Sequence, residues 1–265
     1  MSPLSPDALH LLLLPDAVLA ISRLGWRRRY GDSRRYSVST GGGQWQGHGT
    51  ALGKAFADFP MRRTRVVLAD QFVRYRLLPW RDDLRGSAEY QAWARVEFAS
   101  VYGSLADDWL IVSDDCVPGQ TRLAAAVPTG LLGVLNDAAR ALGRPLLSAR
   151  PCFSVAVNAW QARFPAARDG WVMFDQPGQT CVAFLESGAW RWLRQQRNVD
   201  AAAQRPNEVL ASEQVLAGID TGGVTTLGCG TSPAVGAAGW QHVDLAALDG
   251  FPSAIDAAYA AAWLG

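Results

Sequence analysis

The sequence predicts an α/β protein in which two mixed β-sheets are covered by helices. The chain has 265 residues, of which 49% are hydrophobic and 18% are charged, and this composition is typical of a globular protein with a full core. Short apolar runs typical of strands alternate with longer segments whose apolar residues recur at helical spacing. The first part of the chain has several strands in succession and then alternating helices and strands, and the second part repeats this order. Such an order gives mixed sheets. We therefore expect two related halves, residues 1–169 and 170–265.

The first half opens with two strands. The apolar runs His10–Leu14 and Ala17–Ser22 are separated by Pro15-Asp16, and this pattern predicts a hairpin with a tight turn. A polar, arginine-rich stretch follows, and then a short helix at Ala51–Phe59. The other elements expected in this half are strands at Val66–Leu68, Phe72–Leu78, Trp109–Val112, Thr121–Val127 and Leu146–Ala149 and helices at Ser87–Tyr102, Gly130–Leu142 and Phe153–Phe164.

The two strands on either side of Asp70 are expected to pair with each other through a short link. The helix that follows them carries apolar residues at helical spacing, so one of its faces should pack on a sheet. We expect Trp93 and Phe98 to be buried there, against the sheet that contains Val67 and Val73.

The second half repeats this order with shorter elements. Three strands come first, and a tight turn at Glu186-Ser187-Gly188 joins the last two. A later strand runs into the segment Gly228-Cys229-Gly230, and an alanine-rich helix is expected at the C-terminal end. The expected elements are strands at Trp171–Phe174, Cys181–Leu185, Ala189–Leu193, Val224–Leu227 and His242–Leu245 and helices at Asn207–Ala217 and Ser253–Leu264.

Charge and composition argue against several classes of function. The formal net charge is +1, with 25 Lys and Arg residues against 24 Asp and Glu, so no overall positive field favours nucleic acid. Lys54 is the only lysine, which argues against Schiff-base chemistry. The apolar run Leu9–Leu14 is far shorter than the about 20 residues that span a membrane and lacks the flanks of a signal peptide. We therefore expect a cytoplasmic protein.

Metal-binding and phosphate-binding motifs are also not expected. The cysteines lie far apart without a CxxC pair and the histidines are scattered, so a zinc site is not indicated and the thiols should be reduced and buried. Gly41–Gly43 is not followed by the Gly-Lys-Ser/Thr of a phosphate-binding loop. The residues concerned are Cys116, Cys152, Cys181, Cys229, His10, His48 and His242.

A family resemblance rests on three consecutive segments. Val66–Gly103, with the sequence VVLADQFVRYRLLPWRDDLRGSAEYQAWARVEFASVYG, combines a strand ending in Leu-Pro-Trp with a helix ending in Val-Tyr-Gly. Arg122–Trp160 carries Val127-Pro128 ahead of a leucine-rich helix, and Trp171–Arg197 completes the pattern. This part of the chain resembles the actin-like cytoplasmic proteins of type IV pilus assembly and type II secretion, the PilM/GspL group, whereas the two ends resemble them poorly.

That resemblance implies a two-lobed, actin-like (ribonuclease-H-like) fold with mixed β-sheets covered by helices. In such folds ATP sits between the lobes, held by two hairpin turns of the form Asp-x-Gly and by a glycine-rich adenosine loop. Glycine amides must come close to phosphate, and an aspartate must hold Mg²⁺ directly or through water. The resemblance therefore places the two hairpins at equivalent positions in two similar sheets, facing one cleft.

The first of these hairpins would lie at the start of the chain. It keeps Asp16 as a candidate nucleotide-binding residue, but Ala17 and Val18 stand where a glycine-rich stretch is expected. Pro15 has no N–H to donate to a phosphate, and no lysine follows.

The second hairpin and the adenosine loop would come from the second half. Asp175, Gly178 and Thr180 resemble remnants of Asp-x-Gly-x-x-Thr with one residue inserted, and Pro177 again removes a donor amide. The adenosine loop would lie in a shortened lobe and would keep two glycines, Gly228 and Gly230.

Because each ATP-binding element is altered, we expect a non-catalytic scaffold with no cofactor. The resemblance implies that it binds the cytoplasmic tail of an inner-membrane pilus or secretion protein, at the inner face of that membrane. Two alternatives stay open: a divergent actin-like ATPase that binds Mg-ATP between the lobes, and a stand-alone binding domain without a role in secretion. The choice between a monomer and a homodimer also stays open.

Peripheral membrane association is a further expectation. If the arginines of the first lobe come together, they form a basic patch of the kind that anionic lipid attracts; a solvated hairpin face is the alternative. The arginines are Arg27, Arg28, Arg29, Arg34, Arg35, Arg62, Arg63 and Arg65.

Overall fold

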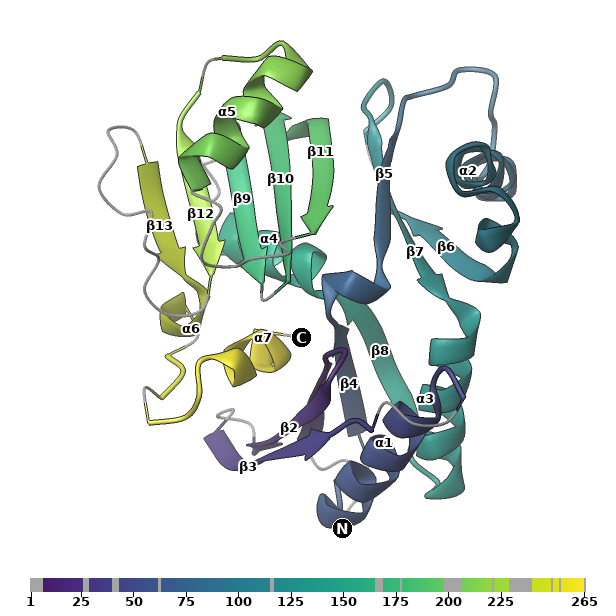
Figure 1. Cartoon of the computed structure of the whole chain (residues 1–265), viewed down its shortest axis with the longest axis vertical. Helices are drawn as coiled ribbons and strands as arrows, with labels where there is room; N and C mark the ends of the chain where they lie inside the picture. The colour runs from purple at the N-terminus through teal and green to yellow at the C-terminus, as the bar shows by residue number, and fades with distance from the viewer. Residues whose placement is uncertain are drawn as a thin grey trace. The chain divides into compact units, whose positions relative to one another are not determined.

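The computed structural model divides into two compact units, each made of separate stretches of chain (Figure 1). Unit 1 comprises Met1–Phe72, Pro128–Ala156 and Leu245–Gly265, and unit 2 comprises Val73–Val127 and Val157–Asp244. This division differs from the continuous halves predicted from the sequence, because residues 73–127 group with the second sheet. The structure describes residues 7–25, 29–39, 43–61, 63–114, 117–164, 169–176, 178–197, 206–220, 222–228, 240–248, 250–252 and 254–264.

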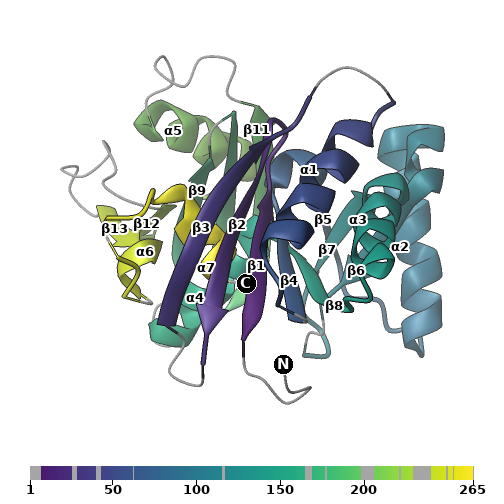
Figure 2. The ribbon, with the colours of Figure 1, turned by 90° about the horizontal axis from the view of Figure 1, so that it is seen from below.

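Unit 1 is built on a five-stranded mixed sheet with the strand order β3-β2-β1-β4-β8 (Figure 2). Its strands are β1 (Ala8–Leu13), β2 (Ala17–Leu24), β3 (Arg29–Ser37), β4 (Arg63–Leu68) and β8 (Leu146–Pro151), and its helices are α1 (Gln46–Asp58), η1 (Asp70–Phe72), α3 (Thr129–Ala141), α6 (Leu245–Leu248) and α7 (Ala258–Leu264). Strands β1, β2 and β3 are antiparallel, whereas β1, β4 and β8 are parallel. Helix α1 packs on α3 and lies against β2 and β3, and α7 lies against β1, β2 and β4.

Unit 2 contains a second five-stranded sheet. Its elements are β9 (Gly170–Gln176), β10 (Gln179–Glu186), β11 (Ala189–Arg197), α5 (Pro206–Ala217), β12 (Val224–Gly228) and β13 (Trp240–Asp244). Helix α5 covers this sheet through Val209 and Leu210, which join a buried cluster with Trp171 and Phe184. After its first passage through unit 2, the chain returns to that unit within α4 (Cys152–Arg163), which connects β8 to β9.

The two five-stranded sheets have the same topology. The second sheet has the order β11-β10-β9-β12-β13, and β9 pairs antiparallel with β10 and parallel with β12, as β1 does with β2 and β4. The turn at Pro15-Asp16 and the turn between Gln176 and Gln179 therefore occupy equivalent places in their sheets, as the sequence predicted. Whether the two turns face one cleft stays a prediction.

A three-stranded sheet with the order β5-β7-β6 completes unit 2. Its elements are β5 (Arg74–Leu78), α2 (Ser87–Tyr102), η2 (Gly103–Asp108), β6 (Trp109–Ser113) and β7 (Arg122–Pro128). Phe98 of α2 is fully buried in a cluster with Leu78, Ile111 and Ala124, and Trp93 packs against this cluster while partly exposed.

The predicted pairing of the strands on either side of Asp70 is wrong. Strand β4 is paired on both edges, with β1 and β8, so it has no edge left for β5. The buried Asp70 accepts the N–H of Phe153 at 3.0 Å, which holds the chain where it leaves the first sheet. Helix α2 consequently packs on the three-stranded sheet and not on the sheet that contains Val67.

Other differences from the sequence prediction concern polar or short segments. The arginine-rich stretch forms β3 because β2 supplies its backbone partners, and such pairing needs no apolar side chains. The predicted helix at Ser253–Leu264 is shorter, since α7 begins at Ala258, whose N–H bonds Oδ1 of Asp256 at 3.0 Å. The remaining strands and helices lie within a few residues of their predicted bounds.

Truncating Phe98 should destabilise the protein strongly. We expect Phe98→Ala to lower the free energy of unfolding by about 3–5 kcal/mol, because it opens a cavity in a fully buried cluster. Val96 lies on the same helix at 64% exposure, so Val96→Ala should change the free energy by less than about 0.5 kcal/mol. Denaturant unfolding measures both, and equal effects of the two changes would show that this face of α2 is not core.

His10 lies in the middle of β1 and is fully buried. Its Nδ1 is 3.3 Å from the carbonyl oxygen of Ala262, and its ring lies 5.4 Å from that of Trp263. Burial, reinforced by the positive charge of Arg23, lowers the pKa of His10 from 6.5 to about 3. The unfolded chain takes up this proton near pH 6.5 and the folded protein does so only near pH 3, so the free energy of unfolding falls as pH decreases through that window.

Replacing His10 should therefore make the free energy of unfolding depend less on pH below pH 7. Between about pH 7.5 and pH 5 the wild-type protein should lose about 2 kcal/mol more of its free energy of unfolding than His10→Gln does. Urea denaturation at the two pH values measures the difference. The same loss in both proteins would mean that His10 titrates normally in the folded state.

Candidate functional site

The first hairpin is closed by its own backbone and by a histidine. The N–H of Leu14 donates to the carbonyl of Ala17 at 2.8 Å, and Nε2 of His48 in α1 lies 3.0 Å from the carbonyl oxygen of Leu14. Ala17 and Val18 are fully buried in β2. The carboxylate of Asp16 is 71% exposed and pairs with Arg35 of β3 at 2.8 Å. Asp16 thus lies at the predicted turn, but its carboxylate is paired with an arginine side chain of β3.

An aromatic cluster that no sequence pattern indicated lies beside this hairpin. The buried His48 makes edge-on ring contacts with Trp45 and with Phe72, at centroid distances of 5.9 and 5.4 Å. These three residues come from the start of α1 and from η1. The cluster holds the imidazole against the carbonyl of Leu14, so this hairpin is fixed by packing as well as by hydrogen bonds.

The second hairpin brings the predicted residues together. Asp175 and Thr180 face each other in the register of β9 and β10, and the Thr180 hydroxyl donates to Oδ1 of Asp175 at 2.6 Å. Gly178 has a φ of 81°, which favours glycine at this turn position. Thr180 is buried. Pro177 lies outside the described residues.

The third predicted element is described only in part. Gly228 ends β12, and a Cβ added there would lie 3.4 Å from Cε1 of His242 in β13. The same histidine has its Nδ1 2.9 Å from the hydroxyl of Thr226. Gly230 lies outside the described residues. Within the described ranges, no three or more His, Cys, Asp or Glu side chains are grouped so that they could hold a metal ion.

The arginine-rich stretch is partly neutralised at the surface. Arg34 pairs with Asp58 at 2.8 Å, and Arg35 pairs with Asp16. Arg27, Arg28 and Arg62 lie outside the described residues, as do Cys116 and Cys229. Two of the arginines that the sequence assigned to a basic patch therefore already have carboxylate partners.

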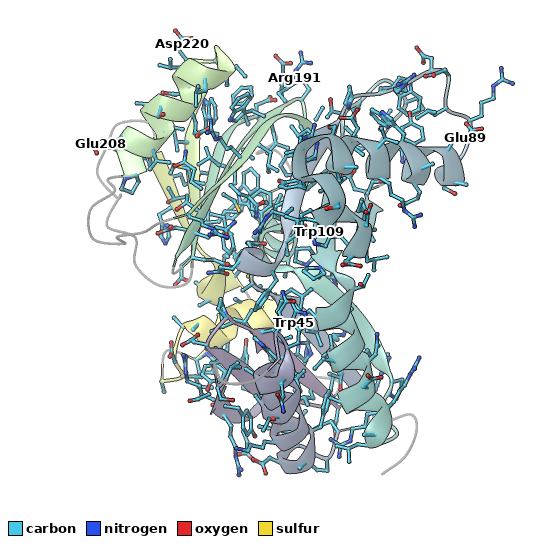
Figure 3. All side chains as sticks on the ribbon, turned by 45° about the vertical axis from the view of Figure 1, so that its right-hand side comes forward. Trp45, Glu89, Trp109, Arg191, Glu208 and Asp220 are labelled. Carbon is cyan, nitrogen blue, oxygen red and sulfur yellow. The ribbon has the colours of Figure 1, made fainter. Side chains whose placement is uncertain are left out.

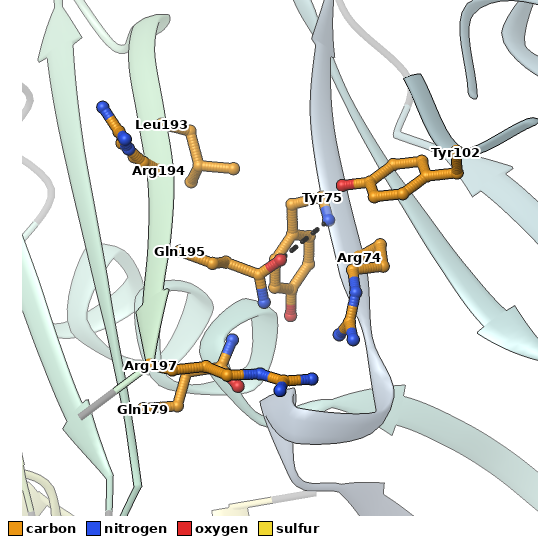
Figure 4. Close-up of a pocket in the computed structure, with 8 residues that line it drawn as sticks. All are labelled: Arg74, Tyr75, Tyr102, Gln179, Leu193, Arg194, Gln195 and Arg197. Carbon is orange, nitrogen blue, oxygen red and sulfur yellow. Dashed lines mark hydrogen bonds between the residues drawn. The ribbon is translucent and has the colours of Figure 1, made fainter. Parts of the chain in front are cut away.

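A cavity of about 350 Å³ in unit 2 is lined by several arginine side chains that the sequence did not indicate as site residues (Figure 4). Its walls come from β5, from the end of α2, and from β10 and β11. The lining residues are Arg74, Tyr75, Tyr102, Gln179, Leu193, Arg194, Gln195 and Arg197. These elements lie far apart in the sequence, so no single linear motif could have indicated the whole set.

A buried carboxylate on the helix side of β11 fixes one wall of this cavity. Glu213 of α5 is fully buried and accepts hydrogen bonds from Nε1 of Trp192, at 2.9 Å, and from the amide of Gln196. Nε of Arg194 lies 3.7 Å from the same carboxylate. The three partners alternate along β11, so the residues between them, including Gln195, point to its other face.

Comparisons with known proteins show a likeness at the level of fold. No protein-family model and no curated protein matches the sequence. The structure matches a chain of the PilM–PilN type IV pilus biogenesis complex with a TM-score of 0.64 and 14% identity, covering 97% of this chain and 96% of that one. It matches the cytoplasmic domain of EpsL, an inner-membrane component of the type II secretion system of Vibrio cholerae, with a TM-score of 0.56 and 10% identity over 92% of both chains.

A third structure names the fold itself. A Bacteroides thetaiotaomicron protein with an actin-like ATPase fold and unknown function matches with a TM-score of 0.62 and 9% identity, over 86% of this chain and 84% of that one. The protein therefore has an actin-like α/β fold similar to those of the pilus and secretion proteins, which confirms the predicted fold and the resemblance at that level. Among the described residues, no helix is both long and apolar enough to cross a membrane.

Removing the carboxylate of Glu213 should loosen β11 from α5. We expect Glu213→Ala to lower the free energy of unfolding by about 3–5 kcal/mol, because it leaves buried donors and a nearby guanidinium without their acceptor. Glu208 is exposed at the start of the same helix (Figure 3), so Glu208→Ala is the matched control and should cost less than about 0.5 kcal/mol. If denaturant unfolding gave the two variants the same stability, the Glu213 carboxylate would not hold α5 on β11.

Proposed function

We propose that the protein is a non-catalytic cytoplasmic scaffold of a type IV pilus or type II secretion platform, where it binds the cytoplasmic tail of an inner-membrane partner. The observation that carries the proposal is the likeness of fold over nearly the whole chain to a chain of the PilM–PilN complex and to the cytoplasmic domain of EpsL. The partner would hold the protein at the inner face of the inner membrane.

The hairpins support the absence of catalysis, because their residues do not fit a Mg-ATP site. Asp16 pairs with Arg35, and one oxygen of Asp175 holds the Thr180 hydroxyl. The amide of Leu14 is bonded to Ala17 within the first hairpin. Pro15 and Pro177 offer no N–H to a phosphate. The converging amides that Mg-ATP needs are therefore not provided by these residues, and the two carboxylates, although exposed, already have partners.

The edge of the three-stranded sheet supports the binding of an extended tail. Strand β6 is the last strand in the order β5-β7-β6, so among the described strands it pairs on one side only. Leu110 and Val112 of β6 are 48% and 54% exposed, whereas Ile111 between them is buried under α2. An extended segment that adds a strand here would form backbone hydrogen bonds and cover the two apolar side chains.

The test uses synthetic peptides of the cytoplasmic segments of single-span membrane proteins encoded beside this gene. We expect one such peptide to bind in isothermal titration calorimetry. Leu110→Lys combined with Val112→Lys should weaken binding at least about tenfold, since charges on an edge strand oppose strand addition. Val96→Lys combined with Val101→Lys, on the exposed face of α2, is the control and should leave the affinity unchanged.

Two outcomes would contradict this proposal. If none of the peptides bound, a scaffold of this kind would have no partner. If a peptide bound equally well to the β6 variant and to the α2 variant, the edge of β6 would not be its site.

The second hairpin favours an alternative function, a divergent ATPase. Asp175, Gly178 and Thr180 are brought together there, as an Asp-x-Gly-type phosphate hairpin would require. We nevertheless expect no ATPase activity above background and no calorimetric binding of Mg-ATP below the millimolar range, because losing two charge-assisted hydrogen bonds weakens binding by several kcal/mol. Micromolar affinity for Mg-ATP that Asp175→Ala abolishes would place the ATPase first.

A further inference from the structure

The open edge of β6 lies in an acidic part of unit 2. Residues 103–114, which form η2, β6 and the position after them, contain three aspartates and no lysine or arginine. Asp107 and Asp108 come directly before the first residue of β6, and both are exposed. Asp114, which comes directly after β6, accepts the N–H of Leu123 in β7 at 2.7 Å through its Oδ1. The carboxylate at the end of β6 thus has a partner within the sheet, and the start of β6 carries two further negative charges.

Two arginines of the three-stranded sheet are engaged elsewhere and do not neutralise this charge. Arg76 of β5 pairs with Glu97 at 3.2 Å, and Arg122 of β7 lies over the ring of Tyr90, 4.1 Å from its centroid. None of the ion pairs between described residues involves Asp107. The start of β6 therefore offers a negative charge to a cation from outside the chain.

Exposed apolar side chains accompany these aspartates along the chain. Leu105 of η2 is 69% exposed, and Leu110 and Val112 of β6 are exposed as well. Side chains alternate along a strand, so a segment added to β6 would place every second residue on the face of Leu110 and Val112. A segment of about seven residues would cover the five residues of β6 and reach the aspartates before it. The edge thus combines an apolar strip with an acidic end.

A second copy of β6 does not fit this edge. Two copies that paired antiparallel would bring the start of one β6 beside the end of the other. Asp107 and Asp108 of one copy would then lie near Asp114 of the other, and like charges on neighbouring strands are destabilising. Parallel pairing would place the aspartates of the two copies side by side. The charge of this edge therefore opposes self-association and favours a segment of opposite sign.

We infer that the segment bound at β6 is basic, an extended stretch with apolar residues at alternating positions and Lys or Arg beside Asp107 and Asp108. This inference rests on the proposed function, which supplies β6 as the docking edge, and it adds which part of a cytoplasmic tail docks there. Lys and Arg are in excess in cytoplasmic segments close to a membrane span. Opposite charges across an interface speed association and fix the register of the partners. The part of the tail next to the membrane therefore matches this edge best.

The experiment uses model peptides, so that it does not depend on the identity of the partner. Each peptide has a core of alternating valine and threonine, with two lysines at its N-terminal end, two lysines at its C-terminal end, or two glutamines in their place. Fluorescence anisotropy measures their binding to the whole protein at low salt. We expect one of the two lysine peptides to bind about threefold to tenfold more tightly than its glutamine counterpart. This difference should fall below about twofold in about 0.5 M salt, which screens exposed charges.

Two pairs of substitutions locate the effect. Asp107→Asn combined with Asp108→Asn should remove the advantage of the lysine peptide and leave binding of the glutamine peptide unchanged. Glu208→Gln combined with Asp220→Asn, near the two ends of α5 (Figure 3), is the matched control and should leave the advantage in place, because it changes the net charge equally. All four residues are exposed, so both variants should fold, and thermal melts check this. Asp107→Asn alone should remove about half of the advantage.

Four results would overturn the inference. They are no binding of any model peptide at millimolar concentration, equal binding of the lysine and glutamine peptides, a preference for lysine that both pairs of substitutions reduce equally, and binding that Leu110→Lys with Val112→Lys leaves unchanged. None of these results affects the scaffold function if a peptide from a neighbouring gene binds. A preference for lysine that needs Asp107 and Asp108, with no binding of any peptide from a neighbouring gene, would support the basic preference of β6 and contradict the scaffold function instead.

Discussion

The fold depends on one constraint, the use of both edges of the first strand in each five-stranded sheet. Strand β1 pairs antiparallel with β2 on one side and parallel with β4 on the other, and β9 pairs in the same way with β10 and β12. The antiparallel neighbour comes back through a tight turn, whereas the parallel neighbour needs a crossover. Because this strand is central in each sheet, the tight turn that follows it must lie at the corresponding end of the strands in both sheets. This is why two unlike sequences, Pro15-Asp16 and Gln176–Gln179, end at equivalent positions.

The sequence predicts those parts of the fold in which local pattern and tertiary pairing agree. The hairpin of β1 and β2 and the helix α2 follow from apolar runs and helical spacing. It fails where pairing overrides local pattern: β3 is polar but lies on the edge of β2, and β4 and β5 are adjacent in sequence but belong to different sheets. An apolar run does not indicate which edges of its strand are already paired with other strands. The pairing of β4 could therefore not be inferred from its sequence alone.

The two candidate sites differ in the same way: the residues of one are local in sequence, whereas the residues of the other are brought together only by tertiary structure. Asp175, Gly178 and Thr180 are close in sequence, so a motif could indicate them, and the hairpin register brings the aspartate and the threonine together. The cavity with Arg74, Tyr102 and Arg197 depends on three elements that meet only in the folded protein. Its wall also depends on Glu213, which helical spacing places on the same face as Val209 and Leu210 but whose charged side chain would suggest a solvated position. Interactions of this kind need three-dimensional evidence, whatever the quality of a sequence motif.

The proposed scaffold function, binding of a membrane partner's tail without use of nucleotide, is tested most directly by hydrogen exchange of the whole protein with each ligand in turn. We expect the partner's cytoplasmic segment to slow exchange of the amides of β6, because an added strand protects an open edge. We expect Mg-ATP to leave exchange of the amides of both hairpins unchanged. Protection of the hairpin amides by Mg-ATP, with no effect of any partner segment on β6, would rule out this function.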